Sequence, residues 1–241
     1  MKKYGLIGNP LSHSFSEPYF QEKFYKEGIR NHEYKAYPLS SLNGFRDWII
    51  IKKLLGINVT TPYKETIIPF LDELTTEAQA IGAVNTIEVL EGKLIGHNTD
   101  HIGFSKSVIA LLDKPVKNAL ILGSGGASKA ITYGLRRIGI NGQIVSRRKK
   151  EKLSYSDLNN TIIKEHLLII NATPLGAHPK REQYPDIPYD LLTQNHFLYD
   201  LVYNPEESLF LSYGKAKKCQ VKNGLEMLHI QAEESWKIWN S

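Results

Sequence analysis

The sequence predicts an α/β protein with two domains, and three observations support this fold class. Short apolar runs alternate with amphipathic stretches along most of the chain. A glycine-rich segment at residues 123–128 follows one of the apolar runs and precedes a helical stretch. The length of 241 residues lies between one and two average domains. Alternating strands and helices are typical of parallel sheets with crossover helices.

The expected strands and helices can be placed along the chain in order. Strands are predicted at residues 4–7, 33–37, 56–60, 84–90, 120–122, 144–146, 167–170 and 197–201. Helices are predicted at residues 14–26, 42–53, 75–81, 102–112, 127–138, 206–217 and 225–239. In the last helix, an apolar face is formed by Leu225, Leu228, Ala232, Trp236 and Trp239. This face is wide enough to dock on a core.

A domain boundary is predicted near Asn98-Thr99-Asp100. A hairpin-like stretch at residues 84–95 ends just before this point, and a new strand-helix-strand pattern begins after it. We expect the last helix to return to the first domain. The predicted domains are therefore residues 1–99 with 225–241, an α/β domain, and residues 100–224, a Rossmann-like doubly wound parallel sheet, separated by a cleft.

Composition limits the partners that we expect. Hydrophobic residues make up 41% of the chain, and the net charge of +5, from 30 basic and 25 acidic residues, is too mild to indicate a nucleic-acid or membrane partner. The single cysteine, Cys219, excludes a disulfide framework and a metal site built on several thiolates. No apolar run has the length of a bilayer span, and a strand follows Met1-Lys2-Lys3 directly. We expect a cytoplasmic protein without a metal.

The glycine-rich segment has the context of a dinucleotide fingerprint. Gly123-Ser124-Gly125-Gly126-Ala127-Ser128 lies between an apolar run and the predicted helix 127–138. Glycines permit a tight turn and close approach of a pyrophosphate, and the free amides at the helix start attract an anion. The third position of the usual pattern is Ser128 rather than glycine. A flexible strand-to-helix turn is the alternative interpretation.

The end of the next predicted strand indicates which nucleotide is preferred. NAD enzymes usually carry an acid there that binds the ribose hydroxyls. Here the strand ends in Ser146-Arg147-Arg148. A guanidinium can hold a 2′-phosphate through two charge-assisted hydrogen bonds, whereas an acid would repel it. The sequence therefore favours NADP over NAD, with a solvated basic loop as the alternative, especially for Lys149 and Lys150.

The first domain offers two ionisable candidates for chemistry. Lys64 follows a predicted strand and the rigid Pro62, at the strand end where α/β sheets present ligands. Asp100 precedes the predicted helix 102–112. The alternatives are a surface lysine and a helix N-cap, a role that aspartate fills well.

Two serines follow the first strand. Ser14 and Ser16 lie at the start of the predicted helix 14–26, where hydroxyls and free amides can bind a carboxylate. Ser14 with Glu17 also matches a capping box, and Pro18 suits the first helical turn. Sequence spacing does not choose between these roles.

Taken together, the motifs resemble shikimate dehydrogenase, and the resemblance covers nearly the whole chain in the family's order. The catalytic turn of the family resembles Asn58-Val59-Thr60 with Pro62 and Lys64. The remaining motifs are Gly8-Asn9-Pro10 through Ser16, Gly82 to Thr86, Gly96 to Asp100, Gly123 to Ser128, Asn171-Ala172-Thr173 and Asn223 to Leu228. The family usually has asparagine, arginine and threonine where this chain has Ser146-Arg147-Arg148.

The resemblance implies roles for individual residues. Catalysis falls to Lys64, which serves the reacting oxygen, and to Asp100. Substrate-binding residues are Ser14 and Ser16 for the carboxylate, Thr60, Asn85, Asp100 and Gln231 for ring hydroxyls, and Tyr203 for closing the site. Cofactor-binding residues are Gly123, Ser124, Gly125, Gly126, Ala127, Ser146, Arg147, Arg148, Thr173 and Gly224.

The implied reaction is the reversible, NADP-dependent reduction of 3-dehydroshikimate to shikimate, in chorismate and aromatic amino-acid biosynthesis. Hydride would pass between the nicotinamide C4 and the substrate C3. We expect the Lys64 ammonium and the Asp100 carboxylate to converge on the substrate, in a monomer or homodimer. The alternatives are a quinate/shikimate dehydrogenase that accepts NAD and a non-catalytic metabolite and nucleotide sensor.

Overall fold

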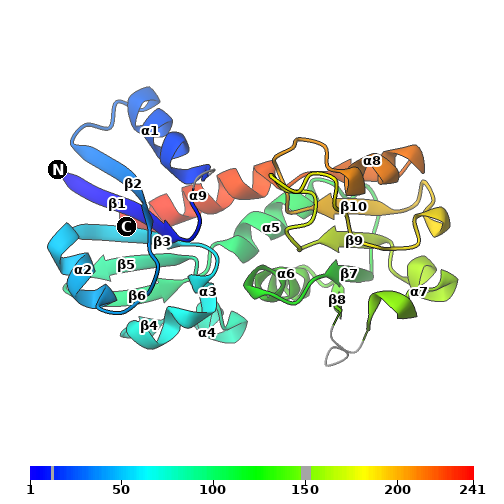
Figure 1. Cartoon of the computed structure of the whole chain (residues 1–241), viewed down its shortest axis with the longest axis horizontal. Helices are drawn as coiled ribbons and strands as arrows, with labels where there is room; N and C mark the ends of the chain where they lie inside the picture. Colours follow the sequence, from blue (N-terminus) through cyan, green and yellow to red (C-terminus); the bar gives the residue numbers. More distant parts are fainter. Residues whose placement is uncertain (12–13, 148–152) are drawn as a thin grey trace. The chain divides into compact units, whose positions relative to one another are not determined.

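The computed structural model describes residues 1–11, 14–147 and 153–241, which form two sheets in two compact units (Figure 1). The first unit contains Met1–Thr99 and Ala232–Ser241, and the second contains Asp100–Gln231. The predicted domains differ from these units only in the assignment of residues 225–231. None of the helices in the described ranges is long and apolar enough to cross a membrane.

The first unit is built on a six-stranded sheet in the order β2-β1-β3-β5-β6-β4. Its elements are β1 (Lys2–Gly8), α1 (Ser16–Lys26), β2 (His32–Pro38), α2 (Phe45–Lys52), β3 (Leu54–Val59), α3 (Tyr63–Thr66), β4 (Glu73–Leu74), α4 (Thr76–Ile81), β5 (Thr86–Leu90) and β6 (Lys93–His97). The strands β2, β1 and β3 are parallel, whereas β5 pairs antiparallel with both β3 and β6. The sheet is therefore mixed rather than all-parallel, because the predicted hairpin is part of it.

Successive residues of β1 supply two separate cores of the first unit. Ile7 packs in a cluster that contains Phe45 and Ile49 of α2. Tyr4 and Leu6, on the opposite face of the strand, pack with α1 and the end of α9 (Leu225–Trp239). Both faces of the sheet are consequently covered by helices.

Gly56 in the first sheet permits close packing of α9 against β3. A Cβ at Gly56 of β3 would lie 2.3 Å from Nε1 of Trp239. The same indole nitrogen donates a hydrogen bond to the backbone oxygen of Ile87, at 3.0 Å. Gly56 therefore lets the large Trp239 side chain lie directly against β3 and β5, which fixes the end of α9 on this unit.

The second unit is built on a five-stranded sheet in the order β11-β10-β9-β7-β8, and every neighbouring pair is parallel. Its elements are α5 (Asp100–Ile109), β7 (Asn118–Leu122), α6 (Gly126–Arg137), β8 (Asn141–Val145), α7 (Asn160–Glu165), β9 (Leu168–Asn171), β10 (Phe197–Asp200), α8 (Leu209–Ala216), β11 (Gln220–Lys222) and the start of α9. From β7 the chain moves to β8 on one side and later returns to β9 on the other. The carboxyl ends of β7 and β9 thus form the topological switch point, where α/β sheets bind ligands.

Candidate functional site

Five strands of the first sheet end, and β5 begins, at the same edge. In the parallel pair β1 and β3, Ile7 lies opposite Val59. Thr86, the first residue of the antiparallel β5, lies opposite both Asn58 of β3 and His97, the last residue of β6. We call this the first-sheet edge. The predicted residues on the segments that leave or enter the strands there are Ser14, Ser16, Thr60, Lys64 and Asn85.

Backbone hydrogen bonds fix the turn that carries Thr60 and Lys64. The Thr60 N–H donates to the Ile7 carbonyl at 2.9 Å, and the Lys64 carbonyl accepts from the Val84 N–H at 2.7 Å. A Cβ at Gly8 would lie 2.4 Å from Cγ2 of Thr60, so glycine at that position permits the close approach. The turn is therefore held both to the end of β1 and to the residue before Asn85.

At the start of α1 the capping-box interpretation is wrong. Ser14 Oγ accepts from the Ser16 N–H, at 3.3 Å, but the Glu17 carboxylate accepts instead from the Ala36 N–H of β2, at 2.8 Å. β2 is an outermost strand of its sheet, so some of its N–H groups have no strand partner. Glu17 thus ties the helix to the sheet and leaves the two serine hydroxyls at the helix start.

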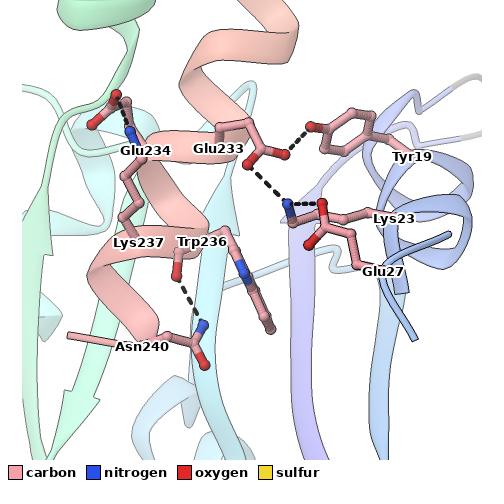
Figure 2. Close-up of polar contacts among 8 residues, drawn as sticks. All are labelled: Tyr19, Lys23, Glu27, Glu233, Glu234, Trp236, Lys237 and Asn240. Carbon is pink, nitrogen blue, oxygen red and sulfur yellow. Dashed lines mark hydrogen bonds and ion pairs between the residues drawn. The ribbon is translucent and has the colours of Figure 1, made fainter. Parts of the chain in front are cut away.

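A cluster of charged side chains joins α1 to α9 within the first unit (Figure 2). The Lys23 ammonium lies 2.7 Å from a Glu27 oxygen and 2.9 Å from a Glu233 oxygen, and Tyr19 donates a hydrogen bond to Glu233. Burial lowers the pKa of Lys23, but the hydrogen bonds to the two carboxylates outweigh it and raise that pKa. Because α1 begins at Ser16, this cluster helps to fix the position of the serines.

The remaining predicted substrate residues belong to the second unit. Asp100 is the first residue of α5 and is buried, and Tyr203, three residues beyond β10, is partly buried. Gln231 is buried on α9 and donates to the Leu228 carbonyl at 2.9 Å. Gly103 of α5 packs against this part of α9, because a Cβ there would lie 3.1 Å from Cβ of Gln231.

The second unit contains a pocket of about 840 Å³ at the switch point. Six predicted cofactor residues line it: Gly123, Ser124, Gly125, Ser146, Arg147 and Thr173. The other lining residues were not predicted: Tyr155, Ala172, Pro174, Leu175, Tyr184 and Asp186. Gly126 and Ala127 open α6 next to the glycine turn, and Arg148 lies outside the described residues.

The glycines of the turn serve different purposes. Gly123 has a φ of +114°, and its N–H donates to the Val145 carbonyl at 2.8 Å. A left-handed φ of this kind is costly for other residues, so Gly123 shapes the turn. Around Gly125, by contrast, a Cβ would meet nothing within 4 Å. That open space lies at the start of α6, whose free N–H groups favour an anion.

A chain of buried hydrogen bonds holds Thr173 at the pocket. The Asn171 side-chain oxygen accepts from the Thr173 N–H at 3.1 Å and from its hydroxyl at 2.6 Å. The Asn171 amide nitrogen donates to Asp200 at 2.9 Å. Asp200 also accepts from the Val202 N–H and the Ser208 hydroxyl. The carboxylate thus orients the Asn171 amide, which in turn orients Thr173.

Asp200 should give the stability of the fold a particular pH dependence. Burial raises its pKa from 3.8 to about 6, against the hydrogen bonds that it accepts. The folded state therefore binds the proton more tightly than the unfolded state, so this group's contribution to stability falls as pH rises from 3.8 to about 6. In urea unfolding between these pH values, we expect the free-energy difference between wild type and Asp200→Asn to fall by about 2 kcal/mol.

The exposed Asp190 provides a control of opposite sign. A hydrogen bond from Lys217 holds the pKa of Asp190 below its usual value. Its contribution to stability is therefore present at neutral pH and is lost as pH falls, so the difference between wild type and Asp190→Asn should rise with pH. If the difference in unfolding free energy between wild type and Asp200→Asn did not depend on pH, burial would not raise the pKa of the Asp200 carboxyl.

Arg147 lines the pocket and interacts electrostatically with Tyr155. Burial raises the pKa of the Tyr155 phenol, the positive charge of Arg147 opposes that shift, and the carboxylate of Asp186 adds to it. All three side chains line the pocket. Among the described residues, the pocket is therefore lined by one guanidinium, which the sequence predicted, and by one carboxylate, which it did not. Among the described residues, no group of three or more His, Cys, Asp or Glu side chains could hold a metal ion.

The mixed-sheet unit, the all-parallel sheet and the pocket at its switch point together define a nucleotide-binding α/β protein with a Rossmann-like unit. A family model described as the shikimate dehydrogenase substrate binding domain matches residues 6–87. The shikimate dehydrogenase (NADP(+)) of Desulforamulus reducens is 34% identical over 98% of this chain and 88% of its own length. The chain belongs to the shikimate dehydrogenase family.

Solved structures agree with this assignment. The crystal structure of shikimate dehydrogenase from Aquifex aeolicus has a TM-score of 0.89 and 35% identity, covering 100% of this chain and 92% of that one. A Thermus thermophilus shikimate 5-dehydrogenase, in complex with NADP(H) and shikimate, has a TM-score of 0.88 and 31% identity, covering 99% and 93%. The predicted α/β fold class and family are confirmed.

Proposed function

We propose that this protein is an NADP-dependent shikimate dehydrogenase, which reversibly reduces 3-dehydroshikimate to shikimate. The observation that carries the proposal is similarity over nearly the full length to relatives of that name. The chain also has Lys64 and Asp100 in the motifs where the family carries its catalytic groups. A sensor that only binds the same ligands would need neither residue.

The first-sheet edge supports a substrate site. We infer that Ser14 and Ser16 bind the substrate carboxylate, since their hydroxyls lie at the start of α1, where the helix N-terminus favours an anion. Thr60 and Asn85, on adjacent segments of the same edge, are suited to ring hydroxyls. Asp100, Gln231 and Tyr203 are assigned to the substrate from the family motifs.

The pocket of the second unit supports an NADP site. The open space beside Gly125, at the start of α6, fits a pyrophosphate, and the exposed Arg147 fits the 2′-phosphate. Thr173 and Ser146 line the same pocket. The bound cofactor supplies hydride transfer at its nicotinamide C4. We assign Gly126, Ala127 and Gly224 to cofactor binding from their motifs.

We infer that Lys64 handles the proton of the reacting oxygen. Oxidation of an alcohol removes a hydride from carbon and a proton from oxygen, and a positioned side chain accelerates the proton transfer. An ammonium group stabilises the developing alkoxide as a hydrogen-bond donor and serves as the acid when the ketone is reduced. We assign Asp100 to catalysis from its family motif.

Steady-state assays with shikimate and quinate, each against NADP and NAD, test the function. NADPH absorbance should report fast turnover with shikimate and NADP and much slower turnover with quinate or NAD. Comparable rates with quinate and NAD would instead indicate a quinate/shikimate dehydrogenase. Binding of NADP by calorimetry without any turnover would indicate a sensor.

Arg147→Ala should change cofactor preference. Loss of a guanidinium that bonds to the 2′-phosphate removes an interaction worth about 2 kcal/mol, so we expect KM for NADP to rise roughly 30-fold and KM for NAD to stay nearly constant. Asp186→Asn is a matched control of opposite charge in the same pocket. It removes a carboxylate that repels the phosphate, so NADP binding should not weaken. Equal losses for both cofactors in Arg147→Ala would contradict recognition of the 2′-phosphate.

We further infer the domain roles, assembly and location of the protein. Residues 1–99 with 225–241 form the substrate domain and residues 100–224 the NADP domain, which is supported by the family match at 6–87. We propose a monomer or homodimer, to be measured by analytical ultracentrifugation. A cytoplasmic location is consistent with charged metabolites that do not cross membranes unaided.

A further inference from the structure

Four buried polar side chains of the first unit form a closed set around Asn85. Asn85 directly precedes β5 and Thr86 begins it, Thr99 lies two residues beyond β6, and Ser235 lies on α9. None is more than 2% exposed. Ser235 is 136 residues from Thr99 in sequence, yet their hydroxyl oxygens lie 3.2 Å apart. Polar groups that are buried this deeply must form hydrogen bonds with other groups of the protein, because water does not reach them.

The backbone fixes the orientation of the Asn85 amide. The Thr99 N–H can only donate, and it lies 2.7 Å from one side-chain atom of Asn85, which must be Oδ1. The amide nitrogen then faces Thr99 Oγ1, to which it donates at 2.8 Å. Thr86 Oγ1 donates to Oδ1 at 3.2 Å. A flipped amide would set donor against donor at Thr99 N.

These assignments determine the direction of the remaining bonds. The Thr86 hydroxyl hydrogen points to Asn85, so Thr86 Oγ1 accepts from Ser235 at 2.7 Å. Because the Ser235 hydrogen is then used at Thr86, the hydrogen between Thr99 and Ser235 is that of Thr99. The result is a ring in which Ser235 donates to Thr86, Thr86 to Asn85, Asn85 to Thr99 and Thr99 to Ser235. Bonds that run in one direction around a ring polarise and strengthen one another.

Two further residues anchor the ring. The Asn58 amide donates to Ser235 Oγ at 3.0 Å, and Tyr34 donates to the Asn58 side-chain oxygen at 2.8 Å. Ser235 Oγ is thus in contact with Thr86, Thr99 and Asn58, which come from three different segments of the unit. It is the single member of the ring that lies outside the motifs at the first-sheet edge.

We propose that Ser235 is a positioning residue for the substrate site: through Thr86 and Thr99 it holds the Asn85 side chain in place, in the orientation that the Thr99 N–H selects. The inference rests on the proposed function, in which Asn85 binds a ring hydroxyl of shikimate. The Thr99 N–H already excludes the flipped amide. The hydroxyls of the ring restrict the remaining motion of the Asn85 side chain before the substrate arrives, which lowers the ordering cost of binding.

Breaking the ring should therefore raise KM for shikimate. The loss of one hydrogen bond that positions Asn85 should weaken shikimate binding by about 1 kcal/mol, so we expect Ser235→Ala to raise this KM roughly fivefold. The kcat and the KM for NADP should stay within about twofold of wild type. Thr86→Val, which breaks the ring at another bond, should have the same effect. Thr86→Ser keeps the hydroxyl and should restore the wild-type KM.

A double-mutant cycle distinguishes positioning from a general structural effect. In an Asn85→Ala background, adding Ser235→Ala should not raise KM for shikimate further, because the residue that it positions is already absent. Ser107→Ala is the matched control. Ser107 is also a fully buried, hydrogen-bonded serine, but it contacts Tyr199 and Glu226. This variant should lose comparable thermal stability without a change in KM for shikimate.

Two kinds of failure can be told apart. If wild type does not oxidise shikimate with NADP, the proposed function is wrong. If wild type is active and Asn85→Ala raises KM, but Ser235→Ala and Thr86→Val leave KM unchanged or act additively with Asn85→Ala, then only the positioning role of Ser235 is overturned.

Discussion

Lys64→Ala is expected to lower kcat for shikimate oxidation by about 100- to 10,000-fold, the usual contribution of a positioned acid or base. KM for shikimate should change by less than about threefold, because the ammonium acts mainly on charge that develops in the transition state. The backbone of the turn does not depend on the ammonium, since its hydrogen bonds use the carbonyl of Lys64 and the N–H of Thr60. NADPH absorbance under saturating shikimate and NADP measures the effect.

Two other substitutions control this experiment. Lys52→Ala removes an exposed lysine at the end of α2 and should leave both constants unchanged. Ser14→Ala removes a proposed carboxylate ligand and should mainly raise KM for shikimate, the opposite pattern to Lys64→Ala. Nearly full turnover by the Lys64 variant would remove Lys64 from the mechanism.

Gly224→Ala should be the most destabilising single change among the predicted site residues. A Cβ at this position would lie 2.3 Å from the carbonyl oxygen of Leu201 and 2.8 Å from its carbonyl carbon. Both atoms belong to the backbone that leaves β10, so no side-chain rotation can relieve the clash. We expect a loss of at least about 3 kcal/mol in the free energy of unfolding, measured by urea denaturation.

Gly125→Ala is the matched control for that loss. Gly125 is exposed, its φ is −84°, and a Cβ there would meet no atom within 4 Å. Its unfolding free energy should stay within about 1 kcal/mol of wild type, while KM for NADP rises because the methyl group occupies the space proposed for the pyrophosphate. Equal stability of the two variants would mean that the backbone near Leu201 moves more easily than the packing indicates.

The long elements of the fold were predictable from periodicity. The helix at 225–239 was predicted with the bounds that the structure has, since fifteen residues carry several repeats of its apolar face. The elements that were missed are α3, β4, α7 and β11, which have between two and six residues. Segments this short show no full period, and tertiary contacts decide their conformation.

The candidate site was predicted unevenly for a similar reason. Ala172, Pro174 and Leu175 follow β9 directly, so the rule that ligands bind at the carboxyl ends of strands was a usable signal for them. Tyr155 and Asp186 reach the pocket from segments between β8 and β10, with no periodic pattern or motif. Ser235 was indistinguishable from a solvent-facing helix position, because hydrogen bonds between distant segments leave no local pattern.

The first unit is formed by the two ends of this chain, so it cannot be completed before the last segment is synthesised. Ala232–Ser241 belongs to the same compact unit as Met1–Thr99, and it brings Trp239, Ser235 and Glu233 to that unit. During translation, Met1–Thr99 therefore keeps part of its apolar surface uncovered until Ala232–Ser241 has been synthesised. Of the two units, the one that begins earlier in the chain is completed later.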